Sequence, residues 1–157
     1  MSAGRSLVAA GCVAVALCVA VSARDLCAQD AAAAKQAMAR MQGEWAMAAG
    51  GGEGELVPGA MLKAYKRVAT GDTTTVTVMG MVYMKAIFTL DPSKKPMTID
   101  YRVIGGEAVG KRQFGVYEFA GDTLKFCFAM PGGERPSDLS GRAGSGHTCS
   151  AWVRAKP

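Results

Sequence analysis

Asp100 is the acidic residue of this sequence that is best placed to take part in chemistry. It stands between Pro96 and Arg102, on the outward parity of a segment in which every second residue is apolar. A lone carboxylate there could act as a general acid or base, but no second acid follows at a spacing that a catalytic pair would need. We therefore expect Asp100 to accept a hydrogen bond that fixes a loop. A hydrolase that uses Asp100 or Glu107 is the weaker alternative.

His147 is the only histidine, and it follows the segment Gly144-Ser145-Gly146. A zinc site at His147 would need more ligands than Cys149 alone. A nucleophile pair of Ser145 and His147 lacks the Gly-x-Ser-x-Gly turn and an orienting acid. We therefore expect a protein that is not an enzyme, with no catalytic residues, no metal site and no cofactor.

Cys127 and Cys149 form the candidate disulfide. Two of the five cysteines, Cys12 and Cys18, lie in the apolar N-terminal segment, which leaves Cys27 and this pair. Alternation places Cys127 on the outward face of its strand, whereas Cys149 shares the parity of the apolar residues after it. If those residues point inward, the two sulfurs point apart, although a bulge in the last strand would reverse its parity. The alternative is that Cys127 is a small buried apolar side chain under the N-terminal helix.

The N-terminal segment predicts export. Arg5 precedes an apolar run over 7–21, and the small residues Val21-Ser22-Ala23 fit a signal-peptidase site. The run is shorter than the roughly 20 apolar residues that span a membrane. We therefore expect residues 1–23 to be a cleaved signal peptide and the mature protein to be periplasmic or extracellular, without a stable membrane span. Retention of the segment, or a lipid on Cys12, is the alternative.

The basic character of the chain does not indicate a nucleic-acid partner. The net charge is +5 and the pI is near 9.1. Basic pairs such as Lys94-Lys95 and Lys111-Arg112 are far apart in the sequence, so no basic stripe is visible. The mature part has the length and the apolar content of one folded domain.

A helix and a loop are predicted before the first long run of strands. Residues 24–42 are rich in alanine, and Ala34, Met38 and Met41 stand at helical spacing, which predicts an N-terminal helix or linker. The run 50–59 contains a triple glycine and is expected to be a flexible loop. No helical pattern of any length follows it.

Strand patterns fill the rest of the chain, separated by turn signals. In one of them the apolar positions of the alternation are Leu62, Ala64 and Val68, and the positions between them include Lys63, Tyr65 and Arg67. Three further segments have these apolar sets: Val76 and Val78; Val82, Met84, Ala86, Phe88 and Leu90; Met97, Ile99, Tyr101 and Val103. The last strand is predicted from His147 to Arg154.

The segment 113–130 predicts a hairpin whose register can be tested on the sequence. Gly121-Asp122 indicates a two-residue turn. That turn places Tyr117 opposite Phe126 on one face and Glu118 opposite Lys125 on the other. A one-sided sheet needs the first arrangement, and the second is a favourable cross-strand pair.

Counting from Trp45, about eight strands fit the chain, which favours an antiparallel sandwich or barrel. Closure into a barrel would remove exposed strand edges. The large inward side chains could line a ligand cavity: Met84, Phe88, Tyr117, Phe126 and Phe128. An eight-stranded barrel is either just filled by its side chains or able to hold one small ligand, and both alternatives stay open.

Several phrases of the sequence resemble a known family. They are Met41-Gln42-Gly43-Glu44-Trp45, Asp91-Pro92 with Lys95-Pro96 and Ile99-Asp100, Gly115-Val116-Tyr117-Glu118, Gly121-Asp122-Thr123-Leu124 with Cys127, and Arg135-Pro136. In this order they are similar to an uncharacterised family of secreted domains expanded in planctomycete bacteria. The resemblance implies a lipocalin-like barrel over residues 43–157 and no agreed activity. It also implies that Trp45 and Arg154 pack together at the closed end, a structural role.

Taken together, the sequence predicts an all-β, lipocalin-like antiparallel barrel of about eight strands, preceded by a short N-terminal helix and a signal peptide. The expected function is non-catalytic binding of a small apolar ligand or of a cell-envelope partner. The alternative is a structural envelope protein with a solid core.

Overall fold

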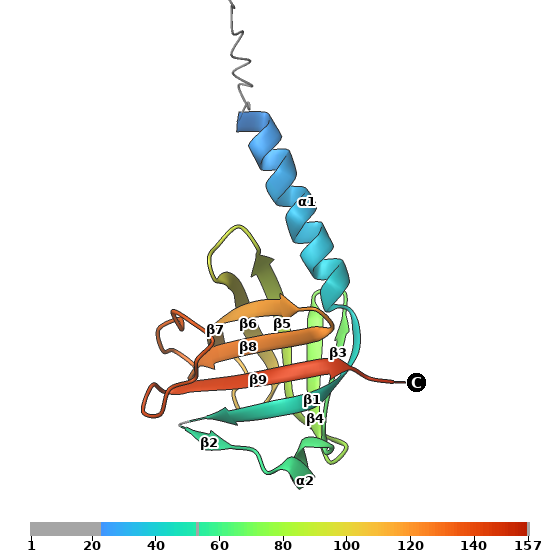
Figure 1. The fold of residues 1–157 in the computed structure, drawn as a ribbon, viewed down its shortest axis with the longest axis vertical. Coiled ribbons are helices and arrows are strands. Elements are labelled where there is room, and N and C mark those ends of the chain that lie inside the picture. The colour runs from blue at the N-terminus through green and yellow to red at the C-terminus, as the bar shows by residue number, and fades with distance from the viewer. Residues whose placement is uncertain (1–22, 53, 157) are drawn as a thin grey trace, which may run out of the picture.

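The computed structural model describes residues 23–52 and 54–156, which form one helix followed by a single sheet that closes on itself (Figure 1). The elements follow one another along the chain as α1 (Ala23–Met41), β1 (Gly43–Gly52), β2 (Glu55–Leu56), α2 (Gly59–Leu62), β3 (Tyr65–Thr70), β4 (Thr73–Val78), β5 (Met81–Asp91), β6 (Met97–Gly106), β7 (Arg112–Ala120), β8 (Thr123–Ala129) and β9 (His147–Arg154).

The sheet closes because β1 pairs with β3 on one side and with β9 on the other. Of the nine strands in the described residues, β2 lies outside the ring, because it pairs with the end of β1 alone, and eight strands remain. All pairings are antiparallel, and each strand of the ring lies beside its neighbours in sequence. The predicted all-β, eight-stranded, lipocalin-like barrel behind a short N-terminal helix is therefore confirmed.

The hairpin of β7 and β8 has the register that the sequence predicts. Tyr117 stands opposite Phe126, and Glu118 stands opposite Lys125. Tyr117 and Phe126 are both buried, whereas Glu118 and Lys125 are exposed. A tight turn at Gly121, whose φ is +59°, joins the two strands. Local turn chemistry and alternation therefore agree on the same two faces of the sheet.

The glycine run Gly50 to Gly52 belongs to β1, so the prediction of a loop there is wrong. These residues pair with β9, and the last two also pair with β2. The backbone of β2 approaches β1 so closely that a Cβ on Gly51 would overlap the carbonyl oxygen of Glu55. Glycine marks a close backbone approach within a strand here, rather than flexibility.

One end of the barrel is closed by α1 and by packed side chains. Trp45 is buried there, and its Nε1 donates a hydrogen bond to the Met41 carbonyl oxygen over 3.0 Å. The Arg154 guanidinium lies 3.9 Å from the centre of the Trp45 ring. The same guanidinium donates to the carbonyl oxygens of Arg40, over 2.6 Å, and of Gln42. The last turn of α1 is thereby fixed to the strands that close the ring.

Beyond that last turn, α1 projects away from the barrel (Figure 1). Ala37 and Met41 are its buried residues, and residues 24–32 are exposed. The helix covers the predicted segment 24–42 almost entirely, whereas the expected signal peptide falls on residues 1–22, outside the described part, apart from Ala23. None of the helices in the described part of the chain has the length and apolar character that crossing a membrane requires.

Candidate ligand-binding cavity

A cavity of about 410 Å³ occupies the half of the barrel away from α1. The turns and loops after β6 and β8 contribute Glu107, Ala108, Met130 and Pro131 to its mouth. Deeper in, its wall is formed largely by apolar and aromatic side chains: Met47, Val76, Met84, Tyr101, Phe128 and Trp152. The barrel is therefore solid in its closed half and hollow in its open half.

The cavity includes two of the five side chains that the sequence suggests for it. Met84 and Phe128 line the cavity. Phe88, Tyr117 and Phe126 do not line it and belong to the packed core instead. Alternation predicts which side chains point inward, but it carries no information on how far along the barrel axis the side chains fill the interior.

Arg67 lies at the inner end of this cavity. It is 5 % exposed and stands between Trp45 and Val76 in the strand register. Its Nη1 donates hydrogen bonds to the Tyr101 hydroxyl, over 2.6 Å, and to Thr74 Oγ1, over 3.2 Å.

The guanidinium also lies over two aromatic rings, 4.5 Å from the centre of Phe126 and 4.8 Å from that of Trp152. Aromatic faces attract a cation, most strongly where water is excluded. These rings and the two hydroxyl groups stabilise Arg67 without neutralising its charge.

No carboxylate within the described residues forms an ion pair with Arg67: the salt bridges there join Asp100 to Arg112 and Arg135, and Asp138 to Arg142. Arg67 Nε is buried and has no hydrogen-bond partner. A buried charge is normally paired, because removing a charge from water is costly. Among the residues that the structure describes, Arg67 therefore presents to the cavity a positive charge that no carboxylate pairs.

Tyr101 complements this charge with a hydroxyl group. Its oxygen accepts the hydrogen bond from Arg67, which leaves its own proton available for donation. Burial raises the pKa of Tyr101 above its ordinary value, and the neighbouring Arg67 opposes that shift only in part. The hydroxyl is consequently neutral at physiological pH and can donate a hydrogen bond into the cavity.

The prediction from alternation that Arg67 lies on the outer face of its strand is wrong. Tyr65, Arg67 and Ala69 point inward in β3, whereas Val68 is 40 % exposed. The signal was available in the turn Gly71-Asp72. A tight hairpin there places Arg67 opposite Val76, and two residues in register share a face of the sheet.

Val82 also lies on the opposite face from the one predicted. The pairing of β4 with β5 shifts after Val76, so that Met84 stands opposite Val76 and Val82 opposite Thr77. This irregularity moves Val82 out of the inward set, and its side chain is 55 % exposed. A bulge of this kind reverses the alternation without an obvious sequence signal.

Asp100 lies on the outside of the barrel and holds the long loop after β8. Its Oδ1 accepts a hydrogen bond from Arg135 Nη2 over 2.5 Å, and Arg112 approaches Oδ2 to 3.9 Å. Arg135 also donates to the carbonyl oxygens of Ile99 and Gly115. The side chain thus has the kind of loop-fixing contact that we expect from the sequence. Glu107 lies apart from it, at the mouth of the cavity.

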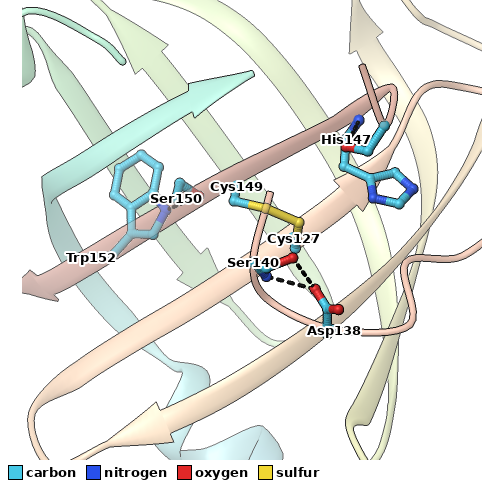
Figure 2. The surroundings of a disulfide bond; sticks show 8 residues. Cys127, Asp138, Ser140, His147, Cys149, Ser150 and Trp152 are labelled. Carbon is cyan, nitrogen blue, oxygen red and sulfur yellow. Dashed lines mark hydrogen bonds between the residues drawn. A yellow bond between two sulfur atoms is a disulfide. The ribbon is translucent and has the colours of Figure 1, made fainter. Parts of the chain in front are cut away.

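Cys127 and Cys149 stand opposite each other on β8 and β9 and form a disulfide (Figure 2). The inward side chain of this part of β9 is Trp152, so Cys149 points outward with Ala151 and Val153, and no change of parity in β9 is needed. The loop residues Asp138 and Ser140 lie beside the bridge, where the Ser140 amide donates to Asp138 over 2.8 Å.

His147 begins β9 and its amide donates to Ser145 Oγ over 3.3 Å. Among residues 24–52 and 54–156, no three histidine, cysteine or acidic side chains stand together as a metal site would require. Cys27, in α1, is exposed and free. Comparison of the chain with protein-family models, curated proteins and solved structures finds no match. A functional assignment therefore depends on the geometry of the cavity.

Proposed function

We propose that this protein is an exported, non-catalytic binding protein that takes one small, largely apolar molecule into the open half of its barrel. The observation that carries the proposal is the cavity of about 410 Å³, enclosed by aromatic and aliphatic side chains. Binding pockets for small molecules have volumes of roughly 300–1,000 Å³ and a predominantly apolar lining with a few fixed polar groups. Arg67 and Tyr101 supply those polar groups.

Exposed apolar side chains gather on the segments that surround the mouth. Met79 and Met81, at the turn between β4 and β5, are 73 % and 72 % exposed, and Tyr83 follows them. Val109, between β6 and β7, and Met130, after β8, are also exposed. Apolar surface concentrated at one end of a small protein indicates a site of interaction. Here it supports entry of an apolar ligand through this end.

Export remains part of the proposal. It is supported by the apolar N-terminal run with its small-residue cleavage pattern, and by a disulfide of the kind that persists in oxidising compartments. The resemblance to secreted planctomycete domains is in keeping with both observations.

The experiment is native mass spectrometry of the gently purified protein, to detect a retained small molecule, followed by thermal shifts against a panel of apolar compounds. Met84→Trp places a large ring in the cavity and is expected to abolish binding, because the ligand and the indole need the same space. Leu26→Trp places the same ring on an exposed position of α1, at the other end of the barrel, and is the control.

Retained ligand, or a compound that raises the melting temperature of the wild type and of Leu26→Trp but not of Met84→Trp, supports the proposal. A protein that carries nothing and responds to no compound in the panel would overturn it in favour of the structural alternative.

A further inference from the structure

The charge of Arg67 narrows the chemistry of the ligand, and this inference rests on the proposed function. The guanidinium is 5 % exposed, lines the cavity and has no carboxylate partner within the described residues. Glu107 is the acidic side chain that lines the same cavity, but it is exposed at the mouth and no ion pair joins it to Arg67. Within the described residues, the inner end of this largely apolar cavity is therefore positively charged.

The donors at this end form a site for an oxygen pair. Both hydrogen bonds that the Arg67 guanidinium makes within the described residues come from Nη1, which leaves the N–H groups of Nη2 for a ligand. The Tyr101 hydroxyl accepts one of these and has its own proton to donate. A guanidinium is planar, carries several N–H donors and matches the two oxygens of a carboxylate.

We propose that the ligand is an apolar molecule that ends in a single carboxylate, bound with the carboxylate against Arg67 and Tyr101 and with its apolar part toward the mouth. One guanidinium neutralises one negative charge, so a singly charged head group leaves no net charge inside the barrel. An alcohol or an amide would leave Arg67 charged and unpaired, which an apolar cavity disfavours. Met84 and Phe128 then contact the apolar part.

The test measures binding of decanoate and of decanol to the full chain by isothermal titration calorimetry. The two probes share an apolar tail and differ in the charge of the head group. We expect decanoate to bind about tenfold to a hundredfold more tightly than decanol, the range that a hydrogen-bonded charge contributes. Trp152 lines the cavity, so its fluorescence reports independently whether the probe enters the barrel.

Arg67→Met removes the charge and keeps an unbranched side chain in its place. We expect this variant to lose the preference for decanoate while its affinity for decanol is kept. It should also fold, because an apolar side chain of similar size is tolerated where a buried charge lacks a partner. The matched control is Arg102→Met, which removes an exposed arginine from β6 and should leave both affinities unchanged.

Equal binding of the two probes to the wild type, or a preference for decanoate that survives in Arg67→Met, would overturn the carboxylate assignment while leaving the cavity as a binding site. Failure of both probes to bind would count against the proposed function itself. If Arg67→Met does not fold, Tyr101→Phe provides the test, because it removes one donor of the site and should weaken decanoate binding more than decanol binding. An equal loss of affinity for the two probes would then count against the carboxylate assignment.

Discussion

Arg154 and Trp45 face each other across the seam between β9 and β1, and the contact that closes the barrel also holds α1. The guanidinium covers the indole ring, and its N–H groups bind the carbonyl oxygens at the end of the helix. These carbonyls have no partner within the helix, and a cation is favourable at a helix C-terminus. The Arg154 side chain thus stabilises both the closure of the barrel between β9 and β1 and the attachment of α1.

Arg154→Met should therefore destabilise the protein by about 1–3 kcal/mol, through loss of the cation–π contact and of the two hydrogen bonds to backbone carbonyls. Denaturant titration followed by circular dichroism measures the change. Arg102→Met, on an exposed position of β6, serves as the control and should change stability by less than about 0.5 kcal/mol. Equal effects of the two variants would show that the contact contributes nothing specific.

The disulfide should contribute about 3 kcal/mol, because the bridged cysteines are 22 residues apart and the bond restricts the unfolded chain. Cys127→Ala combined with Cys149→Ala is expected to lower the melting temperature by the amount that corresponds to this loss of unfolding free energy. Cys27→Ser is the control, since Cys27 is exposed and free, and should leave stability unchanged. An unchanged melting temperature in the double variant would contradict a stabilising role for the bridge.

Gly51→Ala should destabilise the pairing of β1 with β2, because the added Cβ overlaps the backbone of Glu55. We expect faster proteolysis near residues 54–58 and a lower melting temperature. Gly59→Ala, in α2, has no atom within contact range of the new methyl group and should be neutral or stabilising by up to about 1 kcal/mol. Equal resistance of the two variants to proteolysis would show that β2 is not held closely against β1.

Asp100→Asn should loosen the loop after β8, because it removes the charge that pairs with Arg135. We expect faster amide hydrogen exchange over residues 131–146 and unchanged binding in the cavity, which lies on the other side of the sheet. Glu118→Gln, on an exposed position of β7, is the matched control. A hydrolytic turnover that Asp100→Asn abolishes would instead support the enzyme alternative.

Tyr117 should make the protein sensitive to alkaline pH. Burial raises the pKa of Tyr117 to about 12, and the Asp91 carboxylate adds to the shift, while Arg40 opposes it. The tyrosines of the unfolded chain ionise near pH 10. The unfolded state therefore loses protons first, and stability falls as the pH rises from about 10 to about 12, by up to about 3 kcal/mol from this residue.

Tyr117→Phe should reduce the loss of unfolding free energy between pH 8 and pH 11.5, as measured by denaturant titrations at the two pH values. At pH 8 the variant should be neutral or slightly stabilised, because the Tyr117 hydroxyl is buried without a hydrogen-bond partner. Tyr83→Phe, on a side chain that is 61 % exposed, is the control and should leave the pH dependence unchanged. A steep alkaline loss that persists in Tyr117→Phe would show that another group is responsible.

The parts of the fold that could be predicted are those in which two local signals agree. The hairpin of β7 and β8 combines a Gly-Asp turn with alternation on both strands, and its register is correct. In β3 alternation alone predicts that the apolar Val68 points inward, whereas the register set by the following turn places Arg67 there. A charged side chain inside a barrel is an exception to the rule that inward positions are apolar. A search for apolar residues therefore does not find Arg67.

The depth of the cavity and the arrangement of β1 could not be predicted for a different reason. Phe88 and Met84 lie on the same inward face of β5, yet Met84 alone borders the cavity. This difference depends on how side chains from distant strands fill the closed end, which the order of residues along one strand does not reveal. Similarly, the close approach of β2 to Gly51 is a tertiary contact.

The helix α1 and the mouth of the cavity lie at opposite ends of the barrel. Its last turn is fixed at the closed end, and its 19 residues extend about 28 Å at the usual rise per residue. The exposed residues 24–32 therefore extend away from the barrel, on the side opposite the mouth of the cavity. A ligand of the proposed kind would therefore reach the cavity without passing the exposed part of α1.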